Sequence, residues 1–168
     1  MQQAEYVQAN LNCQIKVFCH EHAPFGGPPI KECQPWEFIV LRGVSKEKLF
    51  PSYKEKEIDI FRQASAIIVV CGDSSRDNRY NDYEIITALA VENLLLVVQD
   101  LGLGAVFVTT YGHNQDHVHD RKLLFDNLDL PEHIQPVAVI PVGYPDESEI
   151  VPEKEFRDIK EMIHLDGW

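Results

Sequence analysis

The chain has 168 residues, of which 45% are hydrophobic and 25% are charged, as is usual for a globular domain with its own core. Its 15 basic and 27 acidic residues leave a formal net charge of −12. Such an acidic chain lacks the basic face that neutralises nucleic-acid phosphates, which argues against nucleic acid as its main partner. We expect one domain over residues 1–168.

The composition also gives expectations about location. Met1–Glu5 has no basic residue and leads into no apolar run, so no secretion signal is expected. The apolar stretch Ile85–Leu101 contains Glu92 and Asp100, which argues against a membrane span. Four cysteines in a chain of this size, without such a signal, indicate a reduced, cytoplasmic protein.

Regular structure is expected mainly after a divergent N-terminal segment at 1–33, whose least regular region is Ala23–Cys33. Within it, Gly26–Pro29 forbids a continuous helix or strand. The hydrophobic pattern then predicts four strands, at Phe38–Arg42, Ala66–Cys71, Ala105–Thr110 and Val137–Val142. The last three are almost continuous apolar runs, as expected of strands covered on both faces. Helices are predicted at Glu57–Gln63, Tyr83–Leu101 and Asp120–Asn127.

The Tyr83–Leu101 helix has clear boundaries and an unusual composition. Asn81 as N-cap with Glu84 forms a capping box, and Gly102 stands where a glycine commonly ends a helix. Between these signals the helix is apolar on nearly every face, so it must be buried on several sides. Because the chain is short, we expect one face to meet a second copy of the chain.

The arm at 152–168 mixes acidic and basic residues with apolar ones. Phe156, Ile159, Ile163 and Trp168 recur at helical spacing. We therefore predict a terminal helix that packs on a neighbour.

Three segments, taken together, resemble one family. The first, Gln34–Leu41, begins Gln-Pro-Trp; the second, Asn93–Phe107, contains Gly-Leu-Gly; the third, Leu130–Pro145, ends Gly-Tyr-Pro. In this order and at these separations they resemble the nitroreductase family of FMN oxidoreductases. The resemblance covers residues 34–144. It implies an α+β fold with a mixed central sheet surrounded by helices, and a homodimer through the Tyr83–Leu101 helix.

The same resemblance implies where the flavin binds. A backbone N–H within Phe107, Val108, Thr109 and Thr110 would lie beside flavin N5 and stabilise charge on the ring. In the loop ahead of the first strand, the ring contacts would fall on Pro28, Glu32 and Gln34. The family has an asparagine where this chain has Glu32, and its Ala-Pro pair corresponds either to Ala23-Pro24 or to Gly27-Pro28.

Contacts to the flavin phosphate would fall on Lys154 and Arg157, whose alternative role is a solvated charged surface. The family's N-terminal Arg-Arg-Ser-x-Arg motif is missing, since no arginine precedes Arg42. The resemblance implies an FMN-dependent NAD(P)H oxidoreductase that reduces small electrophiles, such as nitroaromatics or quinones, by ping-pong hydride transfer. The missing motif favours a rival, a non-catalytic dimer of the same fold without tight flavin binding.

Two clusters raise the possibility of a metal-binding protein instead. Cys13, Cys19–His22 and Cys33 supply zinc-type ligands, but their spacing matches no standard finger. His113, His117 and His119 are more typical of a solvated loop, or of a polar lid over a flavin. We therefore predict no metal. Cys71, at the end of an apolar strand, is expected to be structural.

Overall fold

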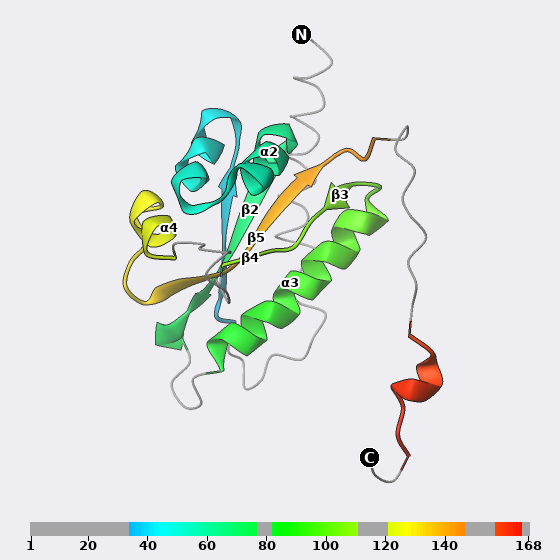
Figure 1. Cartoon of the computed structure of the whole chain (residues 1–168). Coiled ribbons are helices and arrows are strands. Elements are labelled where there is room, and N and C mark those ends of the chain that lie inside the picture. Colours follow the sequence, from blue (N-terminus) through cyan, green and yellow to red (C-terminus); the bar gives the residue numbers. More distant parts are fainter. Residues whose placement is uncertain (1–33, 77–81, 111–120, 147–156, 166–168) are drawn as a thin grey trace.

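The computed structural model describes residues 34–76, 82–110, 121–146 and 157–165, and it confirms the predicted α+β class (Figure 1). The strands are β1 (Trp36–Leu41), β2 (Ala66–Asp73), β3 (Gly104–Ala105), β4 (Val108–Thr109) and β5 (Ile134–Gly143). The α-helices are α2 (Glu55–Gln63), α3 (Tyr83–Asp100) and α4 (Arg121–Asn127). Short 3-10 helices are η4 (Gly43–Ser52), η5 (Ser74–Arg76) and η6 (Ile159–Glu161).

The sheet has the order β1-β2-β5-β3, and β4 also pairs with β5. Every pairing between the described strands is antiparallel. All residues of β2 are buried, as are residues 136–142 of β5, so the prediction of strands covered on both faces is confirmed for this central pair.

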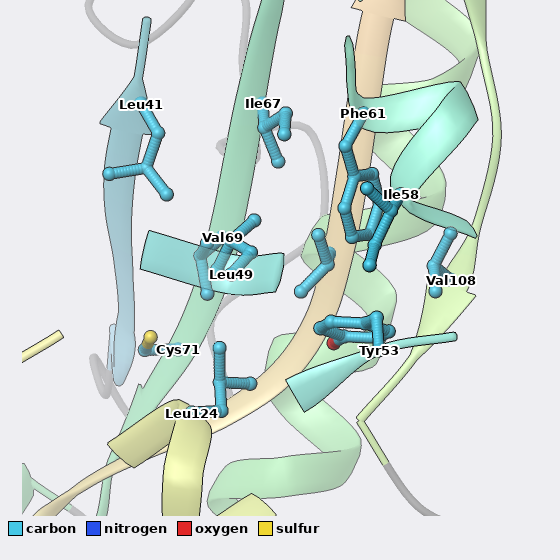
Figure 2. Close-up of a cluster of buried hydrophobic side chains, with 11 residues drawn as sticks. Leu41, Leu49, Tyr53, Ile58, Phe61, Ile67, Val69, Cys71, Val108 and Leu124 are labelled. Carbon is cyan, nitrogen blue, oxygen red and sulfur yellow. The ribbon is translucent and has the colours of Figure 1, made fainter. Parts of the chain in front are cut away.

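Helices cover the two faces of the sheet unequally (Figure 1). On one face, Val91, Leu94 and Val98 of α3 pack on the alternate residues Ile68 and Val70 of β2. On the other face, η4, α2 and α4 enclose a second core around Phe61 (Figure 2). Burying each aliphatic side chain contributes about 1.5–3 kcal/mol, so both cores hold the β2–β5 pair in place.

The C-terminal end of α3 matches the sequence prediction. Gly102 has a positive φ of 71°, its N–H donates to Gln99 O (2.9 Å), and Leu103 N–H donates to Val98 O (3.0 Å). These two bonds form a Schellman motif, which requires a left-handed residue at the position of Gly102. At the other end, Asp82 and not Asn81 is the N-cap, and no side-chain cap hydrogen bond forms. The predicted capping box involves Asn81, which lies outside the described residues.

The predicted strand Ala105–Thr110 is interrupted. Ala105 pairs with Val142 and Val108 with Val139, so β3 and β4 keep one register against β5. Between them Val106 faces Pro141, which has no N–H to donate. The ladder loses one of its two bonds at this position, and the strand is divided there.

The predicted terminal helix is also not found in the described part of the arm. Residues 157–165 contain the single 3-10 turn η6, and Figure 1 shows this segment apart from the sheet. Ile159, Ile163 and Leu165 are exposed there, so no core contact stabilises a longer helix in the single chain.

The outer face of α3 remains uncovered in the single chain. Ile85, Leu89 and Leu96 are 66%, 60% and 57% exposed, and we call these three residues the α3 stripe. This is the helix for which the sequence predicts a contact with a second copy of the chain. Among the described helices, none is both long enough and apolar enough to span a membrane.

We predict that Gly72→Ala destabilises the fold by about 1–3 kcal/mol, because it overpacks the contact between β2 and α3. A Cβ at Gly72 would lie 2.7 Å from Tyr83 Cδ2 and 3.0 Å from Thr87 Oγ1. Urea denaturation measures the change.

Gly143→Ala is the matched control, since its Cβ would meet nothing closer than 3.7 Å. Gly→Ala at a compatible position is expected to be neutral or stabilising by up to about 1 kcal/mol. Equal losses of stability in both variants would contradict the assignment.

Candidate functional site

The edge strand formed by β3 and β4 carries the residues expected to contact a flavin. Ala105 packs against the core under α3, whereas Val108 belongs to the opposite core beside Tyr53 and Phe61 (Figure 2). Because side chains alternate along a strand in constant register, Phe107 and Thr109 lie on the α3 side. Phe107 is 52% exposed and Val108 only 6%, so of these two residues Phe107 presents an apolar surface to solvent.

The register also fixes the direction of the backbone N–H groups. Val106 N–H donates to Pro141 O (3.3 Å), which makes 106 and 141 a hydrogen-bonded pair. In an antiparallel ladder such pairs alternate with pairs whose N–H groups point outward. Phe107 and Thr109 therefore direct their N–H groups away from β5, toward an edge at which none of the described strands pairs.

A cavity of about 290 Å³ adjoins this edge on its α2 side. Its floor comes from Gly104, Val106, Pro141 and Gly143, and its walls come from the C-terminal end of α2 and from Tyr144. Pockets for small ligands measure about 300–1,000 Å³, so this cavity has room for part of a cofactor.

Gly104 and Gly143 are cross-strand partners in this floor. A Cβ would come no closer than 3.8 Å to other atoms at Gly104 and 3.7 Å at Gly143, and neither residue has a left-handed φ. The fold therefore requires glycine at neither position. What the two glycines provide is space, because side chains here would fill the hollow.

Thr110, the last residue of the predicted flavin segment, is 1% exposed and has a structural role. Its hydroxyl donates to Pro136 O (2.9 Å) and lies 3.1 Å from Val137 O. Both carbonyls flank the β-bulge where the register of β2 against β5 shifts. Since a bulge leaves ladder groups unpaired, the hydroxyl supplies a donor that β2 does not.

Gln34 lies two residues before β1, which two other strands separate from the edge strand. It is exposed, while its neighbour Pro35 is buried and accepts a hydrogen bond from Asp73 N–H (2.6 Å). Strands are about 4.8 Å apart, and β2 and β5 separate β1 from β4. The described residues therefore do not bring Gln34 together with Phe107 and Thr109.

Asp73 holds this end of the sheet. Its carboxylate accepts hydrogen bonds from Ser75 N–H (2.9 Å), from Ser75 Oγ (2.6 Å) and from Arg76 Nε (3.1 Å). Burial alone would raise the pKa of Asp73, but these bonds and the nearby His133 outweigh burial and lower the pKa. The carboxylate is therefore a charged anchor for η5 and is poorly suited to act as a proton donor.

Of the remaining predicted residues, only Arg157 belongs to the part of the chain that the structure describes. Arg157 is exposed, donates to Glu161 O (3.2 Å) and forms an ion pair with the Glu161 carboxylate at 3.9 Å. Pro28, Glu32 and Lys154 lie outside the described residues, as do the cysteine–histidine cluster before β1 and the histidine cluster at 113–119. In the part of the chain that is described, no group of three or more His, Cys, Asp and Glu could hold a metal. Cys71 is fully buried in the core around Phe61.

Together these features favour binding over acid–base chemistry. Within the described segments, the residues that line the cavity are apolar or neutral, and none of them is Asp, Glu, His, Lys or Arg. Outward backbone donors and the glycine-floored hollow beside them can hold a flat ligand and hydrogen-bond to its edge, while the exposed Phe107 ring lies on the opposite, α3 face of the sheet. Sequence reasoning located the strand but missed the cavity, for which the cross-strand glycines were the available signal.

Comparisons with known proteins give consistent results. Residues 45–144 match the model of the nitroreductase family. A protein of Methanothermobacter thermautotrophicus, named as a proposed NADH dehydrogenase/NAD(P)H nitroreductase, is 33% identical over 144 residues, 84% of this chain and 70% of its own. A crystal structure of the same name from Bacteroides thetaiotaomicron has a TM-score of 0.73 at 28% identity, covering 92% of this chain and 84% of its own.

A third similarity concerns the fold alone. A structure titled FMN-dependent nitroreductase, from Clostridium difficile, has a TM-score of 0.67 at 22% identity, covering 94% of this chain and 87% of its own. These structures confirm the expected fold.

We predict that Thr110→Val destabilises the chain by about 1–3 kcal/mol, because the bulge carbonyls lose their buried donor without loss of side-chain volume. Chemical denaturation without any ligand measures the change. Thr110→Ser keeps the hydroxyl and is expected to cost only about 1 kcal/mol for the lost methyl group. A Thr110→Val variant as stable as the unchanged chain would refute the structural role of the hydroxyl.

Proposed function

This chain belongs to the nitroreductase family of oxidoreductases, and from that premise we propose that it is an FMN-dependent NAD(P)H oxidoreductase. Its acceptors are small electrophiles such as nitroaromatics or quinones. When bound, FMN supplies the two-electron chemistry, taking hydride from NAD(P)H and passing electrons to the acceptor in a separate half-reaction. We also propose that the protein works in the reducing environment of the cytoplasm.

The observation that carries this proposal is the outward direction of the Phe107 N–H group at the sheet edge. Fixed backbone donors aimed at a ring edge stabilise negative charge there without having to reorganise. The cavity beside this edge fits a flavin in part, because Gly104 and Gly143 in its floor carry no side chain that would take up some of its volume of about 290 Å³. These residues bind and orient the ring, and no side-chain acid or base is required.

The phosphate contact is proposed to come from Lys154 and Arg157, which follow β5 along the chain. Among the described residues, no lysine or arginine lines the cavity. With no arginine before Arg42, the chain has fewer cations to offer than the family motif provides. We therefore propose that FMN binds weakly.

We also propose a homodimer. The α3 stripe exposes three large aliphatic side chains on one face of the helix. Covering each contributes about 1.5–3 kcal/mol, and a second copy presents the same stripe to the first, as two-fold symmetry requires. The rival function, a non-catalytic dimer, uses the same stripe, so the dimer alone does not separate the two.

We predict that FMN raises the melting temperature in a concentration-dependent way, because a ligand of the native state stabilises that state by mass action. Lys154→Ala/Arg157→Ala should weaken FMN binding tenfold or more, since each charge-assisted bond contributes about 1.5–3 kcal/mol. Isothermal titration calorimetry measures both affinities.

Lys48→Ala is the matched control, because Lys48 lies on η4 and pairs at 3.7 Å with the exposed Asp129. It should leave the FMN affinity unchanged. Nanomolar affinity in the unchanged chain would contradict weak binding. Neither heat nor a thermal shift at millimolar FMN would favour the non-catalytic rival.

We predict that Leu89→Glu converts the dimer to a folded monomer, because it replaces an aliphatic side chain of the α3 stripe by a second charge beside the exposed Glu92. Sedimentation at micromolar concentration measures the mass. Val44→Glu is the control, since Val44 is 81% exposed on η4, which covers the other face of the sheet. If the unchanged chain sediments as a folded monomer, the α3 stripe is not a dimer interface.

A further inference from the structure

Pro141 occupies a position in β5 that strands rarely give to proline. β5 is a central strand, paired with β2 on one side and with β3 and β4 on the other. Proline cannot donate to a ladder, so in sheets it is largely confined to edges and bulges. The register of β5 is regular on both sides of Pro141, so no bulge accounts for it.

The missing donor of Pro141 faces the edge strand. Residues 106 and 141 form a hydrogen-bonded pair in which Val106 N–H reaches Pro141 O at 3.3 Å, longer than the usual 2.9–3.0 Å. The return bond, from residue 141 to Val106 O, cannot form. As a result the two-residue bridges β3 and β4 stand on either side of the break.

The break coincides with the cavity. Val106 and Pro141 both line it, together with the glycine pair Gly104 and Gly143 two pairs further along the ladder. Val106 is 47% exposed at this point. One proline therefore loosens the strand on the cavity floor, directly before the two residues that direct N–H groups to the edge.

We infer that Pro141 is a positioning residue for the ligand of this edge. By withholding one ladder bond, it keeps Val106 from being drawn fully against β5, which holds the hollow open and sets the approach of the ring to the Phe107 N–H group. A donor at position 141 would close the ladder, join β3 to β4 and narrow the hollow. This inference rests on the proposed function, because the ligand used to test it is FMN.

Pro141→Val tests the inference, since it restores the donor at a similar side-chain volume. The amide at position 141 should be protected from hydrogen exchange, and the melting temperature without FMN should be equal or higher. The FMN affinity, by titration calorimetry, should fall about tenfold. Pro141→Ala carries the same donor on a smaller side chain and should give the same loss, so the test survives if one variant folds poorly.

Ile67→Val is the control for packing, because Ile67 lies opposite Pro141 on β2 and the change adds no donor. It should leave the FMN affinity unchanged. FMN binding that both Pro141 variants retain in full would overturn this inference and leave the proposed function standing. A loss that Ile67→Val shares would overturn it too, by assigning the effect to packing. An unchanged chain that binds no FMN would overturn both proposals.

Discussion

The pairing of β2 with β5 is the constraint on which the other features depend. Every residue of β2 is buried, and its eight positions pair with β5 from Val142 to Ile134. Since both faces of this pair are apolar, each must be covered, and α3 covers one while η4, α2 and α4 cover the other. The edges of the sheet are then the places where backbone groups and cavities are left for binding.

Departures from regular pairing are concentrated along β5. Near its start, the bulge opposite Cys71 is stabilised by Thr110, and near its end Pro141 interrupts the edge strand. Thr110 and Val106 belong to the two ends of the same edge segment. The stretch Val106–Thr110 is therefore held to β5 by the Thr110 hydroxyl, whereas one ladder hydrogen bond is missing at Val106. This arrangement fits the proposal that the segment presents N–H groups in a fixed direction beside an open hollow.

The sequence predicted the features that depend on local pattern. The buried strands, α3 and its C-terminal glycine follow from apolar runs and from the left-handed preference of glycine, and the structure confirms them. The sequence did not predict features that depend on how strands pair. The break between β3 and β4, for example, depends on which residue of β5 faces Val106. It also did not predict η4, because this helix contains Pro51 and has no periodic pattern of apolar residues. The tail was predicted from helical spacing, but spacing does not create a helix without a surface to pack on.

The candidate site likewise combines a feature that the sequence predicted with features that only strand pairing reveals. Its chemistry-bearing segment, Phe107–Thr110, was identified by resemblance, yet only the register assigns Phe107 and Thr109 to the outer edge and Thr110 to the bulge. The residues on that edge supply donors and apolar surface but no positive charge. Because a phosphate needs cations or helix N-termini, the described edge is suited to the ring of a flavin and not to its phosphate. The affinity of the whole site then depends on residues beyond that edge, so binding to the ring and binding to the phosphate are separable by mutation.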